Sequence, residues 1–513
     1  MSKMLKFMSM VVIIVLGVFN NIEVYARYGD NGFEGGISSG EVEGKTTYDY
    51  KEVVFLTGEP IVFSGTLTVK KTAKKDSTTG KQVITSTYTY KLSDDKNSGT
   101  LTKSVSYNTV ITEKDNGQKI EETKLNGKYS EVINIDGKTF NLRSYDFTKT
   151  NITDSKPAVD YMAGNLWGRK TYSIGADEGT VTVDIVGNFY GYNQYWGSTE
   201  TQILEYMIQS ETVKGNIVDK WGGTATVRLS SSVTKQIKYI ENEPETISFE
   251  GGFVQTQYNN SVLQYSSSLP EFDSEGISTD KLTEKSGSLK LESFPVQTRL
   301  PVPSINHLKG HWAENDIKAL YSLEVFKEDS QKFNPQDVMT RAEFADAIVL
   351  ALKEVPQDSV LSGTKTSKTS KSKKEELLSP FIDVAVDSKY FENINNAYKR
   401  GMISGRGNGR FAPDEYLTMA DAITIIIRAL GLEALAPSGG VATTFVDDTD
   451  IPSYARSFIY VAQRIGLIQG DEKGYLKPCE YLTKARAAVI INKVINYMRD
   501  DLKKDYRERL VNY

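Results

Sequence analysis

One short pattern recurs three times near the end of the chain, and it limits the possible folds more than any other feature. In each copy an aromatic residue or a leucine is followed two residues later by a proline and seven residues later by a threonine, which opens a helix with an apolar stripe. The copies are Thr340-Arg341-Ala342-Glu343, Thr418-Met419-Ala420-Asp421 and Thr483-Lys484-Ala485-Arg486. A fixed arrangement of this kind is an internal repeat, and such units bury their apolar faces only by packing together. We therefore predict an all-α body of three helical repeats with pseudo-threefold symmetry.

The chain before residue 290 has a different character, because its apolar residues alternate with polar ones. Period-two runs bounded by Gly, Asn and Asp are typical of half-buried antiparallel strands. We predict that residues 45–290 form one or two all-β units of the sandwich or barrel type. Asn116-Gly117 and Asn126-Gly127 supply the positive φ of tight hairpin turns. Only residues 200–210 stand out in this region as a candidate helix of ordinary length.

Composition marks the limits of these regions. Two lysines, a short apolar run and the small-residue site at Ala26 predict a secretory signal peptide, so the chain is expected to be exported. Pro301 and Pro303 end the strand pattern, and Ser, Thr and Lys dominate residues 359–374, which predicts a flexible tether. The predicted segments are a signal peptide (1–26), a leader (27–50), the β-rich region (45–290), repeat 1 (303–355), a linker (356–379), repeat 2 (380–435), repeat 3 (444–497) and a charged tail (498–513) that extends the last helix.

The content of histidine, cysteine and charge excludes several classes of function. The net charge of −5 leaves no global basic field for nucleic acid. His307, His311 and Cys479 are the only residues of their types, and all lie outside residues 45–290. A His-based triad, a Cys nucleophile and a zinc site of His and Cys ligands are therefore excluded from the β-rich region, and we predict no cofactor and no metal site. A glycosidase needs only two carboxylates, so that kind of enzyme stays open.

Residues of roughly 306–497 resemble three S-layer homology repeats. The features that carry the resemblance are the start His311-Trp312-Ala313, the entries Phe381-Ile382-Asp383 and Phe445-Val446-Asp447, the loop glycines Gly405 and Gly470, and the tetrapeptide that begins at Thr340. The resemblance implies a module that anchors the protein to secondary cell-wall polymer without a covalent bond. It also implies an acidic ligand, since the terminal amino sugar of that polymer often carries a pyruvate ketal. The expected location is the cell wall or S-layer, with self-association in a surface layer as a further possibility and no membrane contact after signal cleavage.

Arg341 is the residue of the repeats that most suggests a ligand. Thr340 and Glu343 can form a capping box, so a structural role alone accounts for them. A cation in the first helical turn opposes the macrodipole and gains nothing locally, but an anion bound at the same terminus would compensate for this. Trp312 either offers a sugar a flat apolar face or packs beside His311. The predicted polymer-binding residues, which we expect to line grooves between the repeats, are Arg341, Trp312, Glu343, Asp383, Gly405, Asp447, Tyr454, Gly470 and Lys484.

The three copies differ in their charges. Met419 replaces the arginine in repeat 2, so we expect a groove there to bind an anion poorly. Lys484 keeps a positive charge in repeat 3, while Arg486 replaces the acidic capping partner, which makes either a stronger anion site or a frayed helix start. The loop glycines either line the grooves or only satisfy turn geometry. We predict one or two competent grooves, with Arg341 and Lys484 as the main cations.

Three hypotheses for the whole chain follow. The first is a non-catalytic surface protein with a structural or adhesive β-rich region, anchored by its repeats. The second is a wall-anchored enzyme that acts on polysaccharide through carboxylates. The third is a carbohydrate-binding module displayed on the surface, in which Trp167, Trp221 and the tyrosines near Trp196 would stack on sugars. Abundant acidic residues do not distinguish these hypotheses, and we favour the first.

Overall fold

The computed structural model describes residues 35–40, 46–94, 98–176, 178–214, 217–241, 251–356, 359–362, 378–438 and 440–511. The predicted signal peptide and most of the predicted linker lie outside these residues. None of the helices in the described part of the chain has the length and continuous apolar character that crossing a membrane requires.

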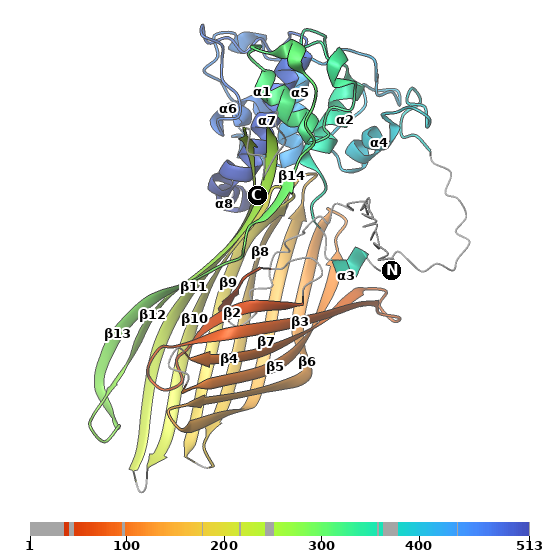
Figure 1. Cartoon of the computed structure of the whole chain (residues 1–513). Coiled ribbons are helices and arrows are strands. Elements are labelled where there is room, and N and C mark those ends of the chain that lie inside the picture. Colours follow the sequence, from red (N-terminus) through yellow and green to blue (C-terminus); the bar gives the residue numbers. More distant parts are fainter. Residues whose placement is uncertain are drawn as a thin grey trace, which may run out of the picture.

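The β-rich region is one large antiparallel sheet of 14 strands (Figure 1). The first 13 strands are neighbours in chain order, and the last one pairs with β12. The strands are β1 (Gly36–Ser38), β2 (Thr47–Val54), β3 (Ile61–Lys75), β4 (Gln82–Asp94), β5 (Thr100–Glu113), β6 (Gln118–Ile135), β7 (Lys138–Ser155), β8 (Asp160–Ile174), β9 (Gly179–Gln194), β10 (Gly197–Lys214), β11 (Ile217–Ile240), β12 (Gly252–Phe272), β13 (Ser278–Glu292) and β14 (Val296–Arg299). The segment predicted as a leader thus contains β1 and the start of β2.

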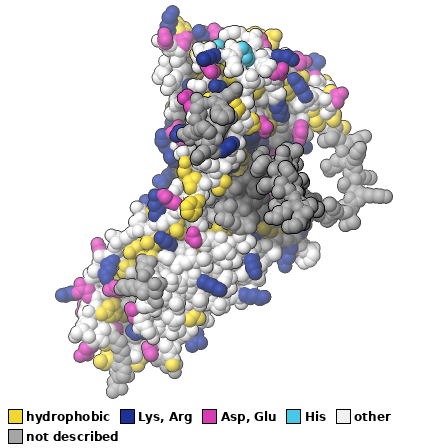
Figure 2. Space-filling model, viewed as in Figure 1, with side chains coloured by type: hydrophobic (Ala, Val, Ile, Leu, Met, Phe, Trp, Pro, Cys, Tyr) yellow, Lys and Arg dark blue, Asp and Glu magenta, His cyan; other side chains and the backbone are white. Residues whose placement is uncertain are grey.

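The sheet curls until its first and last strands approach each other, which makes it nearly barrel-shaped (Figure 1). An exposed ion pair of 2.7 Å joins Glu59, in the β2–β3 turn, to Lys285 of β13. The inner face holds an apolar core that includes the fully buried Leu67, Leu101 and Leu263. In the view of Figure 2, much of the outer surface of the sheet carries neither large apolar nor charged side chains. The alternation along the strands therefore places apolar side chains inside the curl.

Ion pairs are also buried inside the curl. Lys103 of β5 lies 3.1 Å from Glu52 of β2, and Lys170 of β8 lies 2.7 Å from Glu131 of β6. Lys103 and Glu131 are also cross-strand partners, so the four charges alternate across the inner wall. Together with apolar side chains, these residues line a small cavity of about 50 Å³. Because a buried charge is costly without its partner, the pairs fix how the walls of the sheet face each other.

Two sequence predictions in this region were wrong. Residues 200–210 form part of β10, where hydrogen bonds to β9 and β11 on both sides outweigh the local preference for a helix. Asn126-Gly127 lies inside β6, at an interruption of the pairing with both neighbours, and is not a hairpin turn. The hairpin that follows β6 turns instead at Asp136-Gly137, where both residues have positive φ. Asn116-Gly117 does form the predicted turn, between β5 and β6.

The helical region follows the prolines at 301 and 303, as expected. Its helices are α1 (Glu314–Ser322), α2 (Arg341–Leu352), α3 (Ser359–Ser362), α4 (Phe391–Lys399), α5 (Met419–Leu430), α6 (Arg456–Arg464), α7 (Lys484–Asn496) and α8 (Leu502–Val511). We call residues 303–355 unit 1, residues 380–435 unit 2 and residues 444–497 unit 3. Each unit contributes a first helix (α1, α4 or α6) and a second helix (α2, α5 or α7). A π-helical turn, Tyr497–Asp501, joins α7 to α8.

Backbone hydrogen bonds connect the three units in a closed ring. The N–H of Met339 donates to Leu482 (2.8 Å), that of Leu482 to Leu417 (2.8 Å), and that of Leu417 back to Met339 (3.0 Å). The first N–H of each second helix also donates to a carbonyl of the following unit. These pairs are Arg341 with Glu415 (2.9 Å), Met419 with Glu480 (3.1 Å) and Lys484 with Asp337 (2.8 Å). Donors that an isolated helix leaves unpaired are thus satisfied between units.

The other ends of the second helices contact the β sheet. Two hairpin loops of the sheet, 156–159 and 195–196, reach into the helical core, where Trp196, Val159 and Tyr161 are fully buried. Each second helix receives a hydrogen bond from the sheet at or just beyond its last turn. The bonds run from Trp196 Nε1 to Ala351 O (2.9 Å), from Tyr161 Oη to Leu430 O (2.9 Å) and from Gln194 Nε2 to Met498 O (2.9 Å). Residues at this end of the sheet are therefore part of the apolar core of the helical units, while the inner face of the sheet has a core of its own.

Candidate functional site

The start of α2 shows the predicted capping box. The hydroxyl oxygen of Thr340 accepts from the N–H of Glu343 (3.2 Å), and the carboxylate of Glu343 accepts from the N–H of Thr340 (2.9 Å). The same box forms at Thr418 and Asp421, at the start of α5. Capping accounts for Thr340, and it commits one carboxylate oxygen of Glu343 to the backbone.

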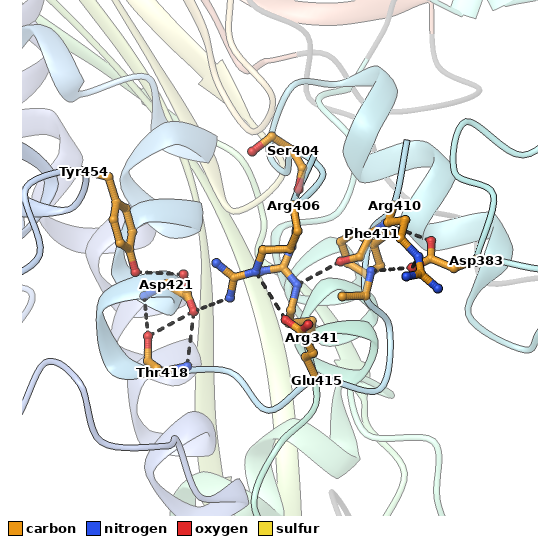
Figure 3. Close-up of polar contacts among 11 residues, drawn as sticks. Arg341, Asp383, Ser404, Arg406, Arg410, Phe411, Glu415, Thr418, Asp421 and Tyr454 are labelled. Carbon is orange, nitrogen blue, oxygen red and sulfur yellow. Dashed lines mark hydrogen bonds and ion pairs between the residues drawn. The ribbon is translucent and has the colours of Figure 1, made fainter. Parts of the chain in front are cut away.

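Arg341 lies at the contact between units 1 and 2, which we call the Arg341 junction. Its Nε donates to the carbonyl of Phe411 (3.0 Å) and its Nη2 to the carbonyl of Ser404 (3.3 Å), while the guanidinium lies 4.9 Å from the centre of the Phe411 ring (Figure 3). Arg341 receives these two acceptors from the loop of the next unit and not from its own helix. Both acceptors are neutral, and among the described residues Arg341 forms no ion pair.

A second arginine completes the junction. Arg406 pairs with Asp421 at 3.0 Å and lies 3.5 Å from Glu415, and its side chain is 41% exposed. Asp421 also accepts from the hydroxyl of Tyr454 (2.9 Å), which places unit 3 beside the same cluster (Figure 3). The junction therefore combines one buried and one partly exposed guanidinium.

The pKa shifts follow from this arrangement. Burial, and after it the nearby charge of Arg406, lower the pKa of Arg341 from its usual value. Burial alone would raise the pKa of Asp421, but Arg406 and the hydroxyls of Tyr454 and Thr418 hold it below its usual value. Arg341 is thus a desolvated cation beside another cation, and a carboxylate reaching it would stabilise the charge.

Lys484 occupies the equivalent position between units 3 and 1, in very different surroundings. Its ammonium lies 2.9 Å from Glu328 and 4.0 Å from both Asp337 and Glu343. One cation faces three carboxylates, so an anionic ligand would meet net negative charge. Between units 2 and 3 the position belongs to the uncharged Met419, which is buried.

The aspartate of each Phe-x-Asp motif fixes the conformation of a loop. The carboxylate of Asp383 accepts from the N–H groups of Phe411 and Ala412, both at 2.8 Å. Asp447 accepts in the same way from Leu476 (2.9 Å) and Lys477 (2.7 Å). Ala412 and Lys477 each have a φ of 60°, so each aspartate fixes a strained turn. Burial would raise the pKa of Asp383, but these N–H donors lower it overall.

The loop glycines are required by close contacts between backbone segments. A Cβ on Gly405 would lie 2.6 Å from the carbonyl oxygen of Arg410, and one on Gly470 would lie 2.8 Å from the carbonyl carbon of Gly474. Neither glycine is needed for a positive φ. Their role in shaping the two loops is therefore steric.

The structure groups the predicted residues into separate sites. Arg341, Asp383 and Gly405 converge on the loop that ends at Phe411, and Lys484 with Glu343 marks another junction. Trp312 is 63% exposed, with its ring 5.5 Å from that of His311. Sequence reasoning missed Arg406 and Glu328, although Arg406 directly follows Gly405 and a second cation in the loop was a usable signal. Nothing local in the sequence indicates that Glu328 pairs with Lys484, 156 residues away.

Residues 304–345 and 381–423 match the family model of the S-layer homology domain. The chain therefore carries S-layer homology domains in units 1 and 2. Together with relatives that are surface-layer proteins, these matches indicate a location at the cell wall or cell surface.

Relatives with different activities are similar to this chain over about the same length. An amylopullulanase of Thermoanaerobacterium thermosulfurigenes is 31% identical over 192 residues, which are 37% of this chain and 9% of that protein. An exoglucanase of Acetivibrio thermocellus is 28% identical over 40% of this chain and 17% of its own length. A surface-layer 125 kDa protein of Lysinibacillus sphaericus is 26% identical over 39% of this chain and 15% of its own length. Each match thus covers less than a fifth of the relative.

Proposed function

We propose that this chain, with its S-layer homology domains, is a non-catalytic surface protein that holds itself on acidic secondary cell-wall polysaccharide through units 1 to 3. Unit 3 acts as a third, diverged repeat, and the three units form a module with pseudo-threefold symmetry. Support for this comes from the ring of backbone hydrogen bonds, in which each unit makes the same contacts to the next. The curled β sheet is the displayed region, with a structural or adhesive role.

The main ligand group in this proposal is a carboxylate, such as that of a pyruvate ketal, bound at the Arg341 junction. The observation that carries it is that Arg341 is buried at 6% exposure beside Arg406, while its hydrogen bonds go to neutral carbonyls. A guanidinium in such a place gains most from an anionic partner. The equivalent Lys484 already faces three carboxylates and Met419 has no charge, so the Arg341 junction is the strongest of the three.

The relatives favour attachment over catalysis as the shared property. The amylopullulanase, the exoglucanase and the surface-layer protein all match less than half of this chain and a small part of their own length. Similarity to proteins of such different activities, over about two fifths of this chain, is better explained by attachment than by any one reaction. We therefore propose no catalytic role for the sheet.

The proposal is tested by binding of the full-length protein to purified cell-wall sacculi, before and after mild acid removes ketal-linked pyruvate. Arg341→Met, which copies the residue of unit 2, is expected to weaken binding to untreated sacculi about tenfold or more, because a charge-assisted hydrogen bond contributes about 1.5–3 kcal/mol. Lys484→Met serves as the matched control and is expected to have a much smaller effect. Equal losses in both variants, or wild-type binding unaffected by the acid treatment, would contradict the assignment.

A further inference from the structure

Two tyrosines lie on the surface at the end of the helical units that faces away from the sheet. Tyr416 and Tyr481 are 52% and 57% exposed, and their ring centres lie 5.5 Å apart in an edge-to-face arrangement. Each stands two residues before the N-cap threonine of its unit, and Val338 holds this position in unit 1. Since α2 has 12 residues, this surface lies about 18 Å from the end of the helix that contacts the sheet.

The backbone holds both rings at the surface. Tyr416 forms a bridge with Thr340, and Tyr481 forms one with Thr418. Because side chains alternate in an extended segment, the next residues, Leu417 and Leu482, point inward and are fully buried. The tyrosines therefore cannot turn into the core. A fixed pair of exposed aromatic rings of this kind is typical of a binding surface.

Charged residues of two junctions are the chain neighbours of these tyrosines. Glu415 precedes Tyr416 in the chain, accepts the N–H of Arg341 with its carbonyl (2.9 Å) and lies 3.5 Å from Arg406 with its carboxylate. Glu480 precedes Tyr481 and pairs with Arg486 at 3.2 Å. Tyr416 thus directly follows a residue of the Arg341 junction, and a half-exposed glutamate precedes each of the two tyrosines in the chain.

We propose that Tyr416 and Tyr481 bind a neutral sugar ring of the wall polymer, next to the sugar whose carboxylate binds at Arg341. This inference rests on the proposed function. The apolar C–H face of a sugar packs against aromatic rings, and its hydroxyls donate to carboxylates such as those of Glu415 and Glu480. Because each tyrosine is about half exposed, the pair offers roughly 150–250 Å², less than the roughly 800 Å² per partner of a stable protein interface, so a glycan fits this surface better than a second copy of the chain.

The test uses the full-length protein and the same sacculi, with and without acid treatment. The double variant Tyr416→Ala/Tyr481→Ala is expected to bind untreated sacculi about tenfold more weakly, and to lose most of the binding that survives removal of pyruvate. Tyr416→Phe/Tyr481→Phe keeps the rings and is expected to bind to within about threefold of the wild type. Tyr475→Ala removes another exposed tyrosine, in the loop between α6 and α7, and is expected to bind as the wild type does. Unchanged melting temperatures show that the variants are folded.

Each outcome decides between the two proposals. Wild-type binding by the double alanine variant, with loss of binding in Arg341→Met, overturns the tyrosine site and leaves the proposed function intact. No loss in either variant overturns both. If sedimentation shows wild-type self-association that the double alanine variant lacks, while sacculus binding is equal, the surface belongs to a second copy and not to a sugar.

Discussion

At their C-terminal ends helices α2, α5 and α7 meet loops of the β sheet, whereas at their N-terminal ends they meet loops of one another's units. At the C-terminal ends the partners are apolar side chains, donors to the last carbonyls and a buried ion pair between Arg509 of α8 and Asp154 of β7, with Trp196 fully buried among the helices. At the N-terminal ends the partners include two arginines and several carboxylates, and Arg406 remains partly exposed. The β sheet thus covers the C-terminal ends of these helices, while the N-terminal ends have charged side chains near the surface.

This difference separates the residues that stabilise the fold from those proposed to bind the polymer. The last carbonyls of a helix need donors, and side chains of the sheet supply them. The first N–H groups are satisfied by the backbone of neighbouring units, so the side chains at that end remain available for other partners. Substitutions at the two ends should therefore affect different measurements.

The largest expected effect is that of Trp196→Ala. Removing this buried ring leaves a cavity where the helices meet the sheet, which should lower the free energy of unfolding by about 3–5 kcal/mol. Denaturant unfolding of the full chain measures this, and Trp167→Ala, which removes a tryptophan that is 40% exposed on the outer face of the sheet, is the matched control. If both variants lost a comparable amount of the free energy of unfolding, Trp196 would have no special role in the contact between the sheet and the helices.

An intermediate effect is expected for Asp421→Asn at the opposite end. The variant weakens charge-assisted hydrogen bonds from Arg406, Tyr454 and Thr418, at a cost of about 1.5–3 kcal/mol at neutral pH. Because the pKa of Asp421 is lowered on folding, its contribution is complete above the unfolded value of about 4 and is lost as the pH falls through the folded value.

Acid titration of the stability provides the check for Asp421. The difference in the free energy of unfolding between the wild type and Asp421→Asn should have its full size above about pH 5 and should decrease as the pH falls below about 4. Asp414→Asn, at an exposed position of the preceding loop, should show no such difference. A difference in the free energy of unfolding that does not change with pH would mean that the carboxylate charge does not stabilise the fold.

The smallest expected effect is a gain of binding at the Lys484 junction. In the Arg341→Met background, Glu328→Gln removes the carboxylate nearest to Lys484, which should strengthen sacculus binding by about 1 kcal/mol, or fivefold. Glu472→Gln, in the corresponding loop of unit 3, is the control. Unchanged binding in the Glu328 variant would show that paired carboxylates are not what separates the two junctions.

Much of the fold could be predicted because the sequence patterns are local. Strand alternation and the repeated capping threonines depend on neighbouring residues, and the structure has strands and helices where those patterns occur. The stretch 200–210 was misjudged because pairing partners on both sides, and not its own preference, decide its state. The hairpin turn predicted at Asn126-Gly127 was wrong for a related reason, since a dipeptide that allows positive φ fits a β-bulge as well as a hairpin turn.

The site was less predictable, because its charges are set by distant residues. The helix signals identified Arg341, but its acceptors lie more than 60 residues further along the chain, at Ser404 and Phe411. The sequence predicted Lys484 as a main cation beside Arg341, but in the structure the carboxylate of Glu328 lies 2.9 Å from its ammonium group. Single-chain patterns indicate which residue types stand at a helix start, whereas the contacts between units decide the electrostatic environment.

The hairpin loops that insert among the helices have a mechanical consequence. Along the chain, the sheet is connected to the helices by the short segment between Arg299 and Asn306. A load on the displayed sheet is nevertheless shared with all three second helices, through Trp196, Tyr161 and Gln194. In the proposed attachment, shear on the sheet is therefore carried to the wall-binding units by several separate contacts and not by one strand of polypeptide alone.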